Sequence, residues 1–343
     1  MNLSKRFLIV FLLFAFLVVV FLWRQRSAST YRGPAQSLTP VSLAFDWTPN
    51  TNHTGIYVAL AQKWYEEEGI ELKILPYSDS VSPDVLVNAG QVDVGISSTE
   101  SITVDAASEA PVVSIAAIIA HNTSALAVLK SSGISRPAQL EGKIYGGYGA
   151  PFEEPVISTI IKNDGGTGAF KNVTLGVEAI EALKSKRVDF AWIFLGWQGV
   201  EAKREGLPIV TFPIDAYGIP DYSTPNIITS AETLEKKKDL LKRFMRATAR
   251  GYEYARTHPR ESAQMLIDAV PPGTFPDTGL VFESQEYLSP RYADQGEKWG
   301  VQSPESWHDY PKFMLDNKSV FDAEGSPVTA IDFDSLYTNE LLE

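Results

Sequence analysis

The stretch VSLAFDWTPNTNHTG, residues 41–55, is the most informative part of this chain. Its first six residues, 41–46, are typical of a buried strand, and a helix is predicted over 56–68. The loop between them is longer and more polar than the roughly two to six residues that such a connection needs. It is therefore predicted to bind a ligand, unless its polar residues only cap the helix while its tryptophan packs in the core. The candidate contacts are Trp47, Asn50, His53 and Thr54.

Strands and helices alternate along most of the remaining chain. Further strands are predicted at 70–75, 92–96, 112–119, 125–129, 143–147, 173–177, 188–194 and 209–214. From residue 231 onward the chain is expected to be mainly helical, with 234–257 the longest such segment. This alternation is typical of an α/β fold in which helices cover both faces of a mostly parallel sheet.

A weak internal sequence similarity indicates two similar lobes. NAGQVDVGI (88–96) and KSKRVDFAWI (184–193) both read as a helix end, a tight turn and an apolar strand. We expect residues 41–122 and 226–343 to form one lobe and 123–225 the other. The chain would cross between them near 121–125 and 221–226, with Tyr222 at the hinge. Ligands of such folds lie outside the carboxyl ends of the strands.

Other polar residues follow the predicted strands of the first lobe. Ser98 and Thr99 start a helix, where hydroxyl and backbone N–H groups bind anions or carbonyl oxygens or simply cap the helix. His121 and Asn122 come where the chain leaves this lobe. They are predicted ligand contacts, with a buried core histidine as the alternative.

The second lobe contributes aromatic and acidic residues. Tyr148 and Glu153 follow the strand at 143–147; the glutamate would accept N–H groups from a ring, or else only complement the first turn of its helix. Trp192 is expected on the core face of its strand and Trp197 beyond the strand end, where it could stack on a ligand. Aromatic rings with amides and carboxylates predict a flat nitrogen heterocycle as ligand.

The N-terminus predicts export. Residues 7–23 form an uncharged apolar run between basic residues. This length falls between the roughly 7–15 residues of a signal-peptide core and the roughly 17–25 of a spanning helix. We expect residues 1–30 to remain as a signal anchor on the extracytoplasmic face of the cell membrane, followed by a tether at 31–40. The alternative is cleavage after 27–29 and secretion to the periplasm or cell-wall space.

Composition excludes several classes of function. The chain has no cysteine, which removes disulfides, zinc–thiolate sites and thiol nucleophiles. Its formal net charge of −12 argues against nucleic acid as a partner. It has no G-x-S-x-G, H-E-x-x-H or Walker motif, so we expect neither catalysis nor a cofactor or metal. An enzyme and a periplasmic sensor domain remain the competing classes.

Four motifs, WTPNTNH, VDVGISS, GYGAPFEEP and VDFAWIFLGW, resemble the solute-binding proteins related to yeast thiamine-pyrimidine synthase. The resemblance covers roughly residues 41–340. It implies a two-lobed periplasmic-binding-protein fold of type II, with two mixed, mostly parallel sheets and a hinge, and an ABC permease as partner. Members of the family bind thiamine pyrimidine precursors, riboflavin, or alkanesulfonates and similar compounds.

Two departures from the family pattern narrow these expectations. The chain lacks the cysteine-rich segment of the yeast-type synthase, so synthesis of the pyrimidine is not expected. Thr48 and Thr54-Gly55 stand where the pyrimidine-binding relatives have bulkier residues, which predicts a wider slot. Riboflavin is therefore the favoured ligand, and hydroxymethylpyrimidine or formylaminopyrimidine the alternative.

Overall fold

The computed structural model describes residues 37–342, apart from 79, 108–111, 176–178 and 323. The predicted anchor at 1–30 and most of the predicted tether lie outside the described residues. Residues 40–343 form one compact unit. Within the described part, no helix combines the length and apolar character needed to cross a membrane.

The first of two sheets combines strands from two separate stretches of the chain, 39–117 and 226–230. Its order is β2-β1-β3-β10-β4, and the bounds are Thr39–Ala44 (β1), Ile70–Leu75 (β2), Val94–Ser97 (β3), Val112–Ala117 (β4) and Asn226–Ser230 (β10). Strand β1 runs parallel to β3, whereas β10 is antiparallel to both β3 and β4. The helices that follow its strands are Thr54–Ala61 (α2), Trp64–Glu67 (α3), Pro83–Asn88 (α4) and Thr99–Asp105 (α5).

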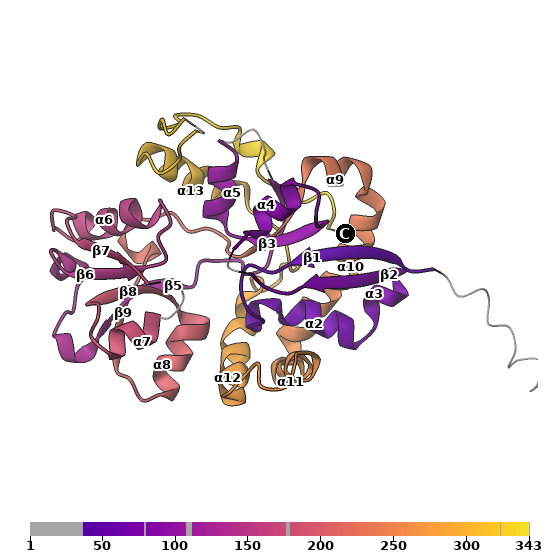
Figure 1. Ribbon diagram of the computed structural model, residues 1–343, viewed down its shortest axis with the longest axis horizontal. Coiled ribbons are helices and arrows are strands. Elements are labelled where there is room, and N and C mark those ends of the chain that lie inside the picture. Colours follow the sequence, from indigo (N-terminus) through magenta and orange to yellow (C-terminus); the bar gives the residue numbers. More distant parts are fainter. Residues whose placement is uncertain (1–36, 79, 108–111, 176–178, 323, 343) are drawn as a thin grey trace, which may run out of the picture. The chain divides into compact units, whose positions relative to one another are not determined.

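The second sheet, at the left of Figure 1, has the order β7-β6-β8-β5-β9, and the first sheet lies to its right. Its strands are Ser124–Leu129 (β5), Ile144–Gly147 (β6), Lys171–Thr174 (β7), Phe190–Phe194 (β8) and Ile209–Pro213 (β9), and its helices are Glu153–Asn163 (α6), Ala179–Lys184 (α7) and Val200–Arg204 (α8). Strand β6 is parallel to β7 and β8, and β5 is antiparallel to β8 and β9. The predicted fold class, with two mixed sheets, is confirmed.

The chain passes between the two sheets twice. It leaves the first sheet after β4, enters the second with β5, and returns between β9 and β10. The second passage contains a cis peptide bond between Thr224 and Pro225. The lobe limits at 122/123 and 225/226 stay a prediction, but both sheet changes fall close to them.

Five α-helices follow β10 in the described part of the chain: Ala231–Lys236 (α9), Lys238–Thr257 (α10), Pro259–Ala269 (α11), Thr278–Leu288 (α12) and Pro304–Asp316 (α13). Helix α10 approaches α2 very closely, since a Cβ added to Gly251 would lie 1.9 Å from the carbonyl oxygen of Gly55. Two predicted helices are interrupted. The segment at 56–68 breaks at Lys63, whose φ is 60°, and the segment at 234–257 breaks at Lys237.

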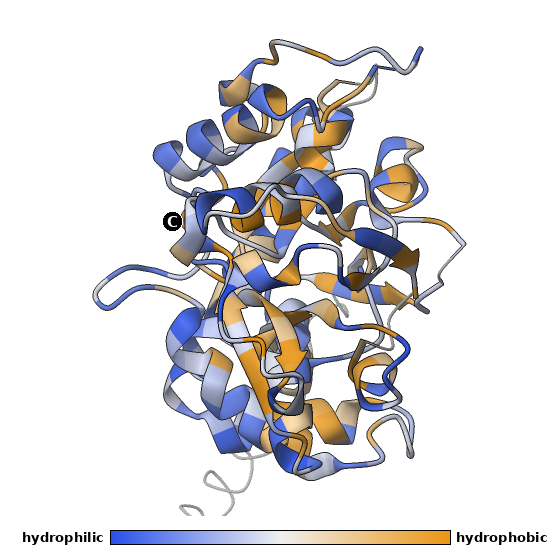
Figure 2. Ribbon diagram, turned by 90° about the vertical axis from the view of Figure 1, so that its left-hand side faces the viewer, coloured by the Kyte–Doolittle hydropathy of each residue, from blue (hydrophilic) through white to orange (hydrophobic). Residues whose placement is uncertain are grey.

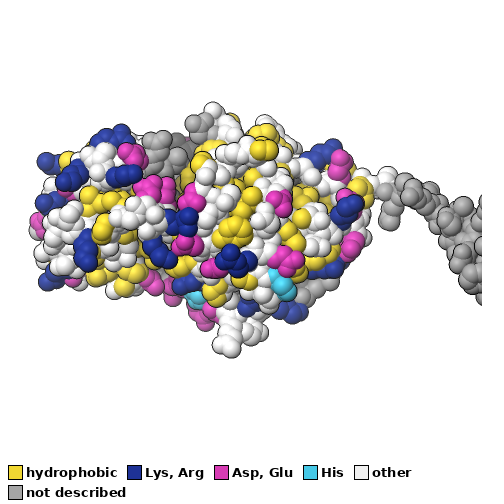
Figure 3. Space-filling view, turned by 90° about the horizontal axis from the view of Figure 1, so that it is seen from below, with side chains coloured by type: hydrophobic (Ala, Val, Ile, Leu, Met, Phe, Trp, Pro, Cys, Tyr) yellow, Lys and Arg dark blue, Asp and Glu magenta, His cyan; other side chains and the backbone are white. Residues whose placement is uncertain are grey.

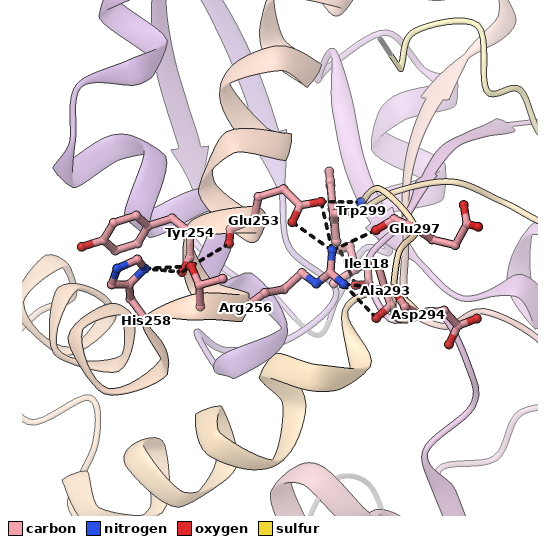
Figure 4. A network of polar contacts seen from close by, with 10 residues as sticks. Ile118, Glu253, Tyr254, Arg256, His258, Ala293, Asp294, Glu297 and Trp299 are labelled. Carbon is pink, nitrogen blue, oxygen red and sulfur yellow. Dashed lines mark hydrogen bonds and ion pairs between the residues drawn. The ribbon is translucent and has the colours of Figure 1, made fainter.

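The end of α10 fastens the C-terminal segment beside the first passage between the sheets (Figure 4). Arg256 donates hydrogen bonds to Glu253 and to the backbone oxygens of residues 293, 294 and 297. Glu253 accepts from the backbone N–H of Trp299, whose Nε1 donates to the carbonyl oxygen of Ile118 at 3.1 Å. The segment after α12 is thereby tied to the end of β4.

The apolar residues gather on the strands and on the inner faces of the helices, as the hydropathy colours of Figure 2 show. One cluster of buried side chains lies around the first sheet with α2 and α10, and another around the second sheet with α6 and α13. On the surface drawn in Figure 3, acidic and basic side chains are interspersed with hydrophobic ones. The chain's acidity is thus compatible with a mixed, well-solvated surface.

Candidate functional site

A cavity of about 290 Å³ is lined by residues from the ends of strands in both sheets. Parallel strands and their following loops bring their carboxyl ends together at such a place. Six of the residues predicted from sequence line it: Trp47, Asn50, Ser98, Tyr148, Trp192 and Trp197. The predicted convergence of strand-end side chains is therefore present in the structure, while their contact with a ligand remains a prediction.

The first loop is built around Asn50, which lies before a short 3-10 helix at Thr51–His53. Its Oδ1 accepts a hydrogen bond from the backbone N–H of Asn52 at 2.8 Å, and its Nδ2 donates to the carbonyl oxygen of Thr48 at 3.0 Å. The side chain is buried, with 3 % exposed. Asn50 thus shapes the loop and also lines the cavity. Both interpretations of this loop, helix capping and a place at the ligand site, are therefore compatible with its position.

His53 supports this loop from behind and does not line the cavity. Its Nδ1 accepts from the backbone N–H of Asn50 at 3.3 Å, and its Nε2 lies 2.9 Å from Oδ1 of Asp46. Because Nδ1 accepts a hydrogen bond, the N–H of the ring is at Nε2, which donates a hydrogen bond to Asp46. The imidazole is fully buried and stacks on Phe45 with 4.0 Å between ring centres. The structure places Asp46, rather than His53, on the cavity wall.

Tryptophans form the apolar walls. Trp47 from the first loop meets Trp197 edge-on, with ring centres 6.3 Å apart and an interplanar angle of 81°. Trp192 is 5 % exposed and packs edge-on against Phe152, so it belongs to both the core and the cavity lining. Its Nε1 is buried and has no hydrogen-bond partner among the described residues. These rings offer faces on which a flat ligand can stack.

Helix α12 joins the two strand-end loops beneath the cavity. The hydroxyl of Ser284 donates to the carbonyl oxygen of Gly196, and the hydroxyl of Thr51 lies 2.5 Å from the same Ser284 oxygen. Since Ser284 has one proton and gives it to Gly196, Thr51 must be the donor to Ser284. Thr51 and Gly196 line the cavity from opposite loops, and Leu288 of α12 also lines it.

Glu153 is fully buried, and the structure does not bring it to the cavity. Its carboxylate accepts hydrogen bonds from the hydroxyl of Tyr145 at 2.5 Å and from the backbone N–H groups of Gly149 and Ala150 at 2.7 and 2.8 Å. A third backbone N–H, that of Tyr148, donates at 3.2 Å. The carboxylate thus holds the loop that presents Tyr148. Glu153 therefore has a local structural role, as in the alternative interpretation, but it acts through direct hydrogen bonds as well as through the helix dipole.

Thr54, Thr99 and Tyr222 also lie outside the cavity lining. Thr54 is buried in the first turn of α2. The hydroxyl of Thr99 donates to the carbonyl oxygen of Ser223 and so joins α5 to the second passage between the sheets. Tyr222 donates to the fully buried Glu100, whose pKa is raised by burial. These contacts hold the wall of the cavity in place.

His121 and Asn122 line a second cavity of about 270 Å³, which shares Thr123 with the first. His121 bridges Asp221 through Nδ1 and Asp294 through Nε2. Its hydrogen bond to Asp221 raises the pKa of His121 to about 9. More than half of the side chain is exposed, so the alternative of a buried core histidine is wrong. The bridge fastens both passages between the sheets to the segment after α12.

Several lining residues were missed from the sequence, among them Asp46, Tyr77, Phe194 and Gln198. Asp46 and Phe194 end or follow predicted strands, so the rule that ligands lie beyond carboxyl ends of strands could have found them. Tyr77 follows the carboxyl end of β2, so the same rule applies to it. Gln198 lies in a π-helical turn at Leu195–Gly199, directly after β8.

Comparisons with known proteins identify the family of this chain. Residues 50–262 match the NMT1/THI5-like family, so the chain belongs to it. It is 28 % identical over 280 residues to the formylaminopyrimidine-binding protein of Halalkalibacterium halodurans, covering 80 % of this chain and 84 % of the relative. A 4-amino-5-hydroxymethyl-2-methylpyrimidine phosphate synthase of Legionella pneumophila is 30 % identical over 235 residues, 67 % of this chain and 74 % of that one.

Solved structures show the same fold at low sequence identity. The alkanesulfonate-binding protein SsuA of Xanthomonas axonopodis pv. citri, bound to MOPS, aligns with a TM-score of 0.61 at 12 % identity, over 82 % of this chain and 92 % of that chain. The nitrate-binding protein NrtA of Synechocystis PCC 6803 aligns with a TM-score of 0.64 at 11 % identity, over 89 % and 87 %. The match of residues 50–262 to the family confirms the family resemblance inferred from the four motifs.

Proposed function

We propose that this protein is the extracytoplasmic binding subunit of an ABC importer and that it captures a thiamine pyrimidine precursor. The observation that carries the proposal is the cavity itself. Three tryptophan rings wall it, Trp47 from the loop after β1, Trp192 from β8 and Trp197 from the turn after β8. Asn50, Ser98 and Gln198 place hydrogen-bonding groups on its lining. Such a combination suits a flat heterocycle with polar edges.

The pyrimidine alternative now replaces riboflavin as the favoured ligand. The wide slot expected from Thr48 and Thr54 has no support, because neither residue lines the cavity. A volume of about 290 Å³ lies just below the roughly 300–1,000 Å³ usual for ligand pockets. One ring fits such a space better than a three-ring flavin with its ribityl chain. The named ligand of the Halalkalibacterium halodurans relative is also a pyrimidine.

The competing class is an enzyme, since other relatives are named as pyrimidine phosphate synthases. We favour capture because the relative that aligns over the greater share of this chain is named as a binding protein. The absence of cysteine removes thiol chemistry from any such reaction. Mass spectrometry of the ligand after incubation with stoichiometric protein and a nucleoside triphosphate as phosphoryl donor separates the two classes. Recovery of unchanged pyrimidine supports capture, and conversion to a phosphate ester contradicts it.

Membrane attachment through residues 1–30 remains part of the proposal. An ABC importer needs its binding subunit on the outer side of the membrane, and both an anchor and a cleaved signal would place it there. Sequencing of the mature N-terminus decides between them. A terminus at or near residue 30 would replace the anchor by a secreted form in the periplasm or cell-wall space.

The ligand is tested by thermal-shift and calorimetric titration of the full chain with formylaminopyrimidine, hydroxymethylpyrimidine and riboflavin. A ligand present at 100 times its Kd stabilises the folded state by about 2.7 kcal/mol. We expect this for a pyrimidine, and a response to riboflavin alone would contradict the assignment. Trp47→Ala should lose about 0.5–1.5 kcal/mol of affinity beyond simple burial, whereas Trp47→Phe, which keeps a ring, should lose less.

A further inference from the structure

The charge of the cavity lining is unbalanced. Among the lining residues that the structure describes, Asp46 is the only one with a formal charge, and no lysine, arginine or histidine accompanies it. The rest of this lining consists of aromatic, amide, hydroxyl and aliphatic groups. An anionic ligand would therefore be desolvated beside a carboxylate without a cation to pair with, which is strongly unfavourable.

The carboxylate of Asp46 is also held in a fixed position. His53 donates from Nε2 to Oδ1 of Asp46 at 2.9 Å, and the histidine is itself oriented by stacking on Phe45 and by the N–H of Asn50. The Asp46 side chain is 31 % exposed, and no donor among the described residues reaches its Oδ2. One oxygen is thus occupied by the protein, while the other remains available on the cavity wall.

We infer that Asp46 is the specificity-determining residue of the cavity, selecting heterocycles with an amidine-like donor edge and rejecting anionic esters of the same rings. The inference rests on the proposed function, which it narrows to unphosphorylated aminopyrimidines. The exocyclic amino group of an aminopyrimidine donates an N–H to a carboxylate, and the neighbouring ring nitrogen becomes a second donor in the same plane when it is protonated. Binding proteins of the same fold capture sulfonate-type ligands such as MOPS, so the fold alone does not set this preference.

Four flat probes test the inference on the full chain by calorimetry. They are 4-amino-5-hydroxymethyl-2-methylpyrimidine, its phosphate ester, benzamidine and benzenesulfonate. We expect the pyrimidine to bind at least 100-fold more tightly than its phosphate, and benzamidine more tightly than benzenesulfonate. This comparison uses the wild-type protein, so it does not depend on whether a variant folds.

Two substitutions then assign the preference to Asp46. Asp46→Asn keeps the size of the side chain and removes its charge; it should weaken binding of the pyrimidine at least tenfold and reduce its advantage over the phosphate. The control is Asp316→Asn, which removes the same charge from an exposed position on α13 that does not line the cavity. The control should leave all four affinities unchanged. Melting temperatures of both variants verify that they are folded.

The outcomes separate this inference from the proposed function. If the pyrimidine does not bind but benzamidine does, in a manner that depends on Asp46, charge selection stands and the pyrimidine assignment fails. If the phosphate or the sulfonate binds as tightly as its uncharged or cationic counterpart, the inference is overturned. An unchanged selectivity in folded Asp46→Asn also overturns it, and binding of none of the four probes overturns both.

Discussion

Replacing Ser284 by alanine should uncouple the two loops that meet at the cavity. The Ser284 hydroxyl donates to the carbonyl oxygen of Gly196 and accepts from Thr51, and both Ser284 and Thr51 are fully buried. A buried hydrogen bond contributes about 0.5–1.5 kcal/mol net. Loss of two such bonds should therefore lower the free energy of unfolding by about 1–3 kcal/mol.

Ser262 provides a matched control on the neighbouring helix α11. It is also a fully buried serine, but its Oγ has no hydrogen-bond partner among the described residues. Ser262→Ala removes a hydroxyl that makes no such bond, so it should be neutral or slightly stabilising. The difference between the two variants isolates the hydrogen bonds of Ser284 from the general effect of a buried serine-to-alanine change.

Urea unfolding of the wild type and both variants measures the free energies, and calorimetry measures ligand affinity. Because Thr51 and Gly196 both line the cavity, Ser284→Ala should also weaken ligand binding. Each 1.4 kcal/mol of binding free energy that is lost raises the Kd about tenfold. If Ser284→Ala unfolds at the same urea concentration as Ser262→Ala, the reasoning about this linkage is refuted.

Two further predictions concern stability. Gly251→Ala should destabilise the fold by about 1–3 kcal/mol or more, because its Cβ would lie 1.9 Å from the carbonyl oxygen of Gly55. In thermal melts Gly199→Ala, whose Cβ would meet its nearest neighbour at 3.4 Å, should stay close to wild type; equal melting temperatures for the two variants would contradict the argument. Burial, followed by the charge of Asp84, raises the pKa of Asp105 from 3.8 to about 8. Between these values the native protein keeps a proton that the unfolded chain releases, so stability falls as pH rises through this window. Asp105→Asn should flatten that fall in urea unfolding at pH 5, 7 and 9, and parallel profiles for variant and wild type would count against it.

Much of the local structure could be predicted because it depends on neighbours in sequence. Ser82 and Pro83 mark the start of α4 by residue type, and the Ser82 hydroxyl accepts from the backbone N–H of Val85. The apolar run at 112–119 gave β4, which is buried along its length. Helix breaks were harder to predict, because Lys63 adopts a left-handed backbone conformation that no glycine or proline announces.

For Glu153, the residue type alone left its role open. A glutamate in the first turn of a helix can face a cavity or turn back to the loop before it, and both arrangements satisfy the same short-range pattern. The structure shows that three backbone N–H groups and the hydroxyl of Tyr145 occupy its carboxylate. Such a choice depends on how the loop folds over the helix end, which periodicity does not encode.

The sequence by itself determined the order of the strands and helices apart from β10, which was not predicted, together with the family and the loops in which binding residues would occur. These features follow from hydrophobic periodicity, capping residues and motifs, all of which act over a few positions. Only the tertiary structure decided which side chains reach the cavity. Thr51 and Ser284 are 233 residues apart, and their contact arises because α12 packs beneath both strand-end loops. Similarly, His53 was expected at the ligand but lies behind Asp46, since burial against Phe45 turns its ring away from the cavity wall.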